Sequence, residues 1–74
     1  MADALPKLGP RNSVWMAWRG RNGDGLEFAR VKLDYGQHSF TAGREIKSDA
    51  DFAPAVAALI AAITQHFAER GMRV

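Results

Sequence analysis

The chain contains no cysteine, so it can form neither a disulfide nor a thiolate metal site. It also lacks the basic start, apolar run and small-residue cleavage site of a secretory signal. Its longest apolar run, residues 52–63, is shorter than the roughly 20 residues that span a bilayer. We therefore expect a cytoplasmic protein that does not enter a membrane. The 74 residues allow one small domain, and at this size oligomerisation is the remaining source of added stability.

The sequence also lacks recognisable groupings of metal-binding, catalytic or phosphate-binding residues. His38 and His66 have no further histidine or cysteine at metal-ligand spacing. Asp49 and Asp51 lie where a helix is expected to begin, which fits capping better than acid–base catalysis. The glycines in residues 20–25 do not lie between a strand and a helix, as a phosphate-binding loop would require. We expect no enzyme activity, no metal and no cofactor.

Charge is small in total and unevenly distributed. The net charge is +2, but residues 1–47 hold eight Lys and Arg against five Asp and Glu, a balance of +3. Residues 48–74 hold two against three, a balance of −1. The basic half permits a polyanionic partner without requiring one.

The first half of the chain predicts an antiparallel sheet. Strand character is found in residues 13–21, 26–35 and 38–46. Asn22-Gly23-Asp24-Gly25 is a strong turn signal between the first two, and Gly36-Gln37 marks a second reversal. The third stretch is weaker, and it is either one strand or two short pieces divided near Gly43.

The second half predicts one helix. Asp51 as N-cap places Pro54 in the first turn, while Ser48 as N-cap would let Asp51 close a capping box; we favour the later start. Gly71 offers a left-handed stop. The fold class is therefore α+β: a flexible arm over residues 1–12, a three- or four-stranded antiparallel meander over 13–47, and a helix over 51–70.

The alternation of side chains predicts a core face and a mixed face for each strand. In the first strand we expect Val14, Met16 and Trp18 to face the core. In the second strand Ala29, Val31, Leu33 and Tyr35 form the apolar side. If like faces pair, one exposed surface collects the aromatic and cationic side chains, namely Trp15, Arg19, Arg21, Phe28, Arg30 and Lys32. Single-stranded nucleic acid binds such a surface by stacking and phosphate pairing, although a solvated face whose cations serve solubility is the alternative.

The predicted helix is apolar on all sides. Its large residues form one stripe, composed of Phe52, Val56, Leu59, Ile60, Ile63 and Phe67, that should cover the sheet. Alanines occupy the rest of its surface: Ala53, Ala57, Ala58, Ala61 and Ala62. One sheet covers only one side of such a helix, so we expect the alanine side to contact a second copy of the chain. The alternative is an exposed alanine side favoured by helix propensity alone.

The order of elements resembles the single-stranded-DNA-binding domain of the transcriptional coactivator family called positive cofactor four. The similarity covers about residues 12–67 and is carried by WRGRNG, LEFARVKLDY, TAGREIKS and DFAPAVAALIAAI. It implies a curved sheet, a dimer formed by paired helices, and a channel for single strands. By this resemblance the channel would be lined by Arg19, Arg21, Arg30, Lys32 and Arg44, with Trp15 and Phe28.

Two functions follow as hypotheses. The first is a non-enzymatic homodimer that binds single-stranded or melted DNA, acting in transcription or other DNA transactions through backbone charge and stacking. The second is a small protein-binding module or inhibitor that uses an exposed Trp and Arg surface as its hot spot.

Overall fold

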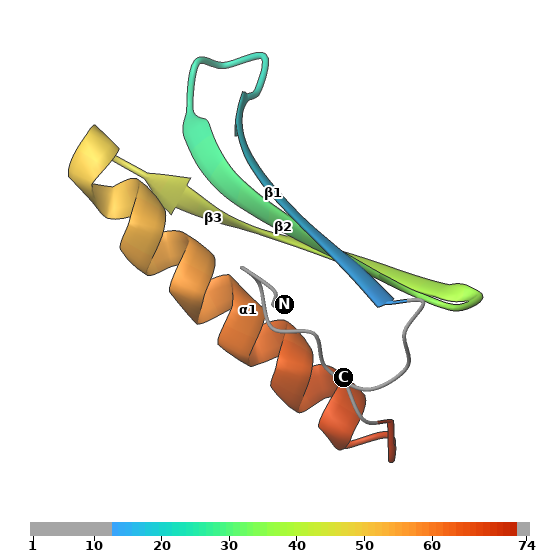
Figure 1. Cartoon of the computed structure of the whole chain (residues 1–74). Helices are drawn as coiled ribbons and strands as arrows, with labels where there is room; N and C mark the ends of the chain where they lie inside the picture. The colour runs from blue at the N-terminus through green and yellow to red at the C-terminus, as the bar shows by residue number, and fades with distance from the viewer. Residues whose placement is uncertain (1–12, 73–74) are drawn as a thin grey trace.

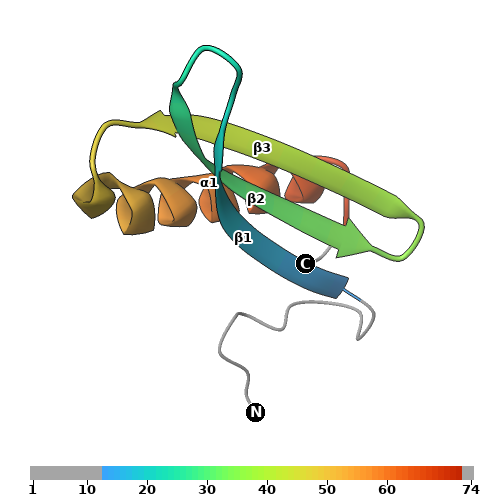
Figure 2. The same ribbon diagram turned by 90° about the horizontal axis from the view of Figure 1, so that it is seen from above.

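The structure, a computed structural model, describes residues 13–72, so the arm predicted for residues 1–12 lies outside the described residues. Its elements are β1 (Ser13–Arg21), β2 (Glu27–Tyr35), β3 (His38–Ile46), a 3-10 turn (Asp49–Asp51) and α1 (Phe52–Ala68). The strands form one antiparallel sheet in the order β1-β2-β3, and α1 lies across one face of it (Figures 1 and 2). The predicted α+β fold is confirmed, and β3 runs unbroken through Gly43.

Both residues predicted as possible N-caps lie in the turn that leads into the helix. Ser48 caps the 3-10 turn, and α1 follows directly after Asp51. Asp51 has helical backbone angles, and its carboxylate accepts hydrogen bonds from the backbone N–H groups of Lys47 (2.8 Å) and Ser48 (3.1 Å). The last turn ends before Gly71, which has the left-handed φ of 77° that was expected of a stop.

The core lies between α1 and the helix-facing side of the sheet. It is formed by Trp15, Ala29, Val31, Leu33, Ile46, Ala55, Leu59, Ile63 and Phe67. α1 packs mainly against β2 and β3. Its buried residues repeat every four positions from Ala55, so the buried stripe includes a small residue that the large-residue pattern omitted, while Phe52, Val56 and Ile60 are only partly buried.

Candidate functional site

The sheet has two faces that differ sharply in their environment. Ala29, Val31 and Leu33 of β2 are almost completely buried with α1, so their side of the sheet is the helix face. Directly opposite residues of paired strands share a face. The other side, which we call the open face, is therefore composed of Val14, Met16, Trp18 and Gly20 of β1, Phe28, Arg30, Lys32 and Asp34 of β2, and Ser39, Thr41, Gly43 and Glu45 of β3.

Trp15 lies on the helix face, and the prediction that it is exposed among arginines is wrong. It pairs with Leu33, and only 8% of its surface is exposed. Its indole N–H is buried and has no hydrogen-bond acceptor among the described residues. Trp15 is thus a core residue and cannot stack on a ligand.

The three residues predicted to face the core from β1 lie instead on the open face. Val14 is 55% exposed and Met16 is 52% exposed. Trp18 is partly buried and pairs with Arg30 of β2. β1 has apolar residues on both sides, so the residue types of this strand alone do not predict which side is buried.

The hairpin loop decides which side of β1 is buried. Asn22 N–H donates to the carbonyl of Leu26, and Gly25 N–H donates to the carbonyl of Asn22, both at 3.0 Å. This is the pattern of a three-residue loop whose last residue is left-handed, and Gly25 has a φ of 86°. A four-residue loop would place Arg21 opposite Leu26, whereas the structure pairs Arg21 with Glu27. A difference of one residue in register moves every side chain of β1 to the opposite face of the sheet relative to the side chains of β2.

Arg30 lies at the centre of the open face. Its guanidinium carbon is 5.1 Å from the centroid of the Phe28 ring. A Cβ built on Gly43 would be 3.3 Å from its Nη1, and one on Gly20 would be 3.4 Å from its Nε. The side chain therefore lies across the sheet over two glycines of the neighbouring strands. Among the described residues Arg30 forms no ion pair, while Lys32 reaches Asp34 at 3.7 Å.

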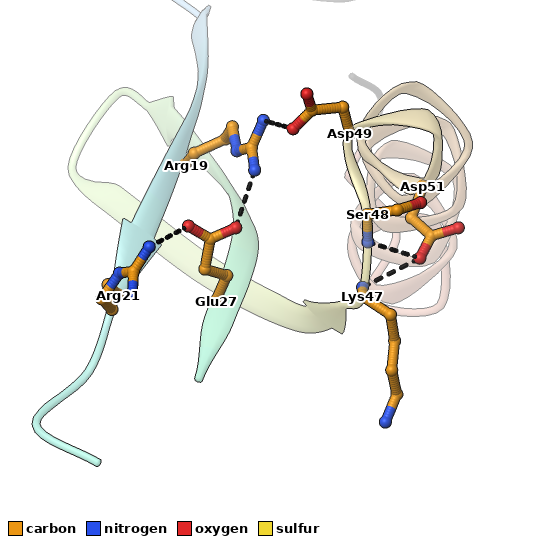
Figure 3. A network of polar contacts seen from close by, with 7 residues as sticks. All are labelled: Arg19, Arg21, Glu27, Lys47, Ser48, Asp49 and Asp51. Carbon is orange, nitrogen blue, oxygen red and sulfur yellow. Dashed lines mark hydrogen bonds and ion pairs between the residues drawn. The ribbon is translucent and has the colours of Figure 1, made fainter. Parts of the chain in front are cut away.

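Arg19 and Arg21 lie on the helix face, where both form ion pairs with carboxylates. Arg19 donates to Asp49 (2.8 Å) and Glu27 (2.7 Å), and Arg21 donates to the other oxygen of Glu27 (2.7 Å), as Figure 3 shows. Hydrogen bonds to Asp49 and Glu27 raise the pKa of Arg19 above its usual value. The hydrogen bond from Arg19 lowers the pKa of Glu27 below its usual value. This chain of ion pairs joins the hairpin to the turn before α1, so the two arginines do not form one surface with Arg30 and Lys32.

Arg44 is separated from the open face as well. It pairs with Ala29, which places it on the helix face of β3. There it borders an open hollow of about 310 Å³ between the end of β3 and the start of α1, which is also lined by Glu45, Asp51, Pro54, Ala55 and Ala58. Of the seven predicted nucleic-acid-binding residues, the structure brings together Phe28, Arg30 and Lys32. Trp18, Met16 and Val14 of this surface were missed, and the loop conformation at Gly25 is the signal that would have placed them.

The outer side of α1 is free of the sheet. Ala53, Ala57, Ala61 and Ala62 are exposed, and Ala58 is partly buried. Pairing of helices through this side stays a prediction. The segment Asp49–Ala68 is long and apolar enough to cross a membrane by length and composition alone, a test that core helices of soluble proteins also pass.

The two histidines have different surroundings. His38 is exposed at the start of β3. His66 stacks on Phe40 with 4.2 Å between ring centroids, and its Nδ1 is 3.3 Å from Arg70 Nη1. Within residues 13–72 no group of three or more His, Cys, Asp or Glu side chains is placed to hold a metal ion.

Comparison of the chain with protein-family models, curated proteins and solved structures found no match.

Proposed function

We propose that this chain is a small non-enzymatic binding module that docks on another protein through the open face of its sheet. The observation that carries the proposal is the position of its exposed apolar residues. Val14, Met16 and Leu26 are the exposed large hydrophobic residues of the described chain. The first two belong to the open face, and the hairpin pairing continues it to Leu26. An apolar patch gathered on one side of a small domain is typical of a protein interface.

The centre of this patch has the composition of an interaction hot spot. Trp18 and Arg30 are directly opposite each other, and Phe28 lies beneath the Arg30 guanidinium. Trp and Arg are the residues whose truncation most often weakens protein interfaces. Because Arg30 has no carboxylate partner among the described residues, it can pair with an acidic group of the bound protein. The expected partner surface is apolar around one carboxylate.

The charge of the open face favours a protein over a nucleic acid. Arg30 and Lys32 are its two cations, and Asp34 and Glu45 are its two carboxylates, so its formal charge is zero. Affinity for nucleic acid depends on several phosphate contacts to cations. The arginines that would add them, Arg19 and Arg21, lie on the other side of the sheet. Single-stranded DNA binding stays a prediction, now with Trp18 in the place of Trp15.

The test compares matched arginine variants. Immobilised wild-type protein, Arg30→Ala and Arg70→Ala are incubated with nuclease-treated cell lysate, after thermal melting has shown that all three are folded. We expect a retained protein that is lost with Arg30→Ala and kept with Arg70→Ala. The purified partner should then bind Arg30→Ala at least about tenfold more weakly by calorimetry, as for a hot-spot truncation.

Two outcomes would contradict the proposal. Retention that is equal for the two variants, or no retained protein, removes the open face as a protein-binding surface. Binding of a labelled single-stranded oligonucleotide that weakens between about 50 and about 200 mM salt and is abolished by Arg30→Ala would instead establish the nucleic-acid function.

A further inference from the structure

The outer edge of β1 presents backbone groups that no described strand pairs with. β1 is at one end of the sheet order, with β2 on its inner side. The Asn22–Leu26 hydrogen bond starts an alternation in which Gly20, Trp18 and Met16 bond to β2. The N–H and C=O groups of Trp15, Ala17 and Arg19 therefore point to the outer edge.

The first two thirds of β1 lack the features with which proteins usually block edge pairing, and its two charged residues, Arg19 and Arg21, are held by Glu27 and Asp49. The segment Ser13–Trp18 has no charged residue and no proline, and its register with β2 is continuous. The opposite edge strand, β3, carries adjacent Arg44 and Glu45 and is followed by Lys47. α1 packs against β2 and β3, which leaves the edge of β1 without a helix over it. β1 is thus the edge that can accept another strand.

We propose that β1 pairs antiparallel with β1 of a second copy of this chain, about a two-fold axis at Ala17, and that the two sheets form one six-stranded sheet. Ala17 is the middle of the nine residues of β1, so this register centres the contact on the strand. It places Ala17 opposite itself and Trp15 opposite Arg19 of the second copy. These are the residues whose backbone groups point outward, so the hydrogen-bonding positions coincide.

The side chains of β1 suit this register. On the open face, Met16 would lie opposite Trp18 of the second copy, a pairing of thioether and aromatic ring that is favourable. On the helix face, Arg19 would lie opposite Trp15, so no cations face each other across the contact. A register centred on Arg19 would bring two Arg19 side chains together, which disfavours it. A second copy of the chain fits this edge because β1 itself contains both members of each of these pairs.

The contact differs from the helix pairing predicted from the alanine surface, and single cysteines separate the two. The chain has no cysteine, so Ala17→Cys or Ala57→Cys gives one thiol per copy. Both alanines are exposed. We expect a dimer in sedimentation velocity, and a short bis-maleimide that cross-links Ala17→Cys but not Ala57→Cys. A monomer, or cross-linking of Ala57→Cys in place of Ala17→Cys, would overturn the proposal.

A charge variant tests the contact without cross-linking. Met16→Lys would remove the thioether–ring contact with Trp18 of the second copy and place two lysines diagonally across the contact, whereas Thr41→Lys puts the same charge on the open face of β3. We expect Met16→Lys to raise the dimer dissociation constant about tenfold or more, and Thr41→Lys to leave it unchanged. Equal constants for both variants would overturn the proposal. Arg30→Ala, which tests the open face as a protein-binding surface, should leave the dimer intact, so the two contacts are tested by different variants.

Discussion

Trp15 on β1 lies directly opposite Leu33 on β2, and both side chains are buried in the core. Because opposite residues of an antiparallel pair share a face, this pair places the odd-numbered residues of both strands on the helix face. Trp18 and Arg30, also opposite each other, are thereby placed on the open face. The surface that we propose for binding is a consequence of the hairpin register.

Substitution of one valine on each face tests the difference in burial between the two faces of the sheet. Val31 is 1% exposed on the helix face, whereas Val14 is mostly exposed on the open face. Truncation of a buried side chain loses transfer free energy and leaves a cavity, so Val31→Ala should lower the free energy of unfolding by about 2 kcal/mol. Val14→Ala should change it by no more than about 0.5 kcal/mol. Urea denaturation checks both, and equal losses would show that the two sides of the sheet are not distinguished as described.

The hairpin loop depends on the left-handed conformation of Gly25. A side chain at this φ is strained, so Gly25→Ala should cost about 1 kcal/mol of stability. Gly23 is the matched control: open space surrounds both glycines, and only Gly25 has a positive φ. Gly23→Ala should therefore be close to neutral in the same denaturation experiment. A loss at Gly23 as large as that at Gly25 would argue against the three-residue loop.

Acid should weaken the ion pairs between the hairpin and the turn before α1. The folded state lowers the pKa of Glu27, so its contribution is complete above the unfolded pKa of about 4.3 and is lost as the pH falls through the lower folded value. The difference in Tm between wild type and Glu27→Gln should thus narrow between about pH 7 and about pH 3. Glu69→Gln at the end of α1, remote from Arg19, serves as the control. A Tm difference for Glu27→Gln that does not change with pH would contradict this role.

The elements of the fold were predictable because their signals are local. Strand character, the Asn-Gly and Gly-Gln reversals and the helix pattern predicted the three strands and α1 nearly to their ends. Ser48, Asp51 and Gly71 marked the limits of the helical segment. Each of these features depends on a few neighbouring residues, and the sequence contains them all.

The faces of the sheet were not predictable in the same way. β1 carries Trp15 on one side and Trp18 on the other, so its hydrophobic pattern fits either orientation. The choice depends on whether the hairpin loop has three residues or four, and Asn22-Gly23-Asp24-Gly25 allows both. The prediction grouped Arg19 and Arg21 with Arg30 because it assumed that the mixed faces of the two strands lie on the same side of the sheet. Glu27 shares a face with these two arginines only in the register of the three-residue loop, and Asp49 is 30 residues from Arg19 in the sequence.

The most direct test of the account is the accessibility of the two tryptophans, measured by acrylamide quenching of single-tryptophan variants. Trp18→Phe leaves Trp15 as the fluorophore, and Trp15→Phe leaves Trp18; circular dichroism verifies that both variants are folded. We predict that the emission of Trp15 is blue-shifted and less strongly quenched than the emission of the partly buried Trp18. The reverse result would contradict the register of the hairpin, and with it the open face on which both proposals depend.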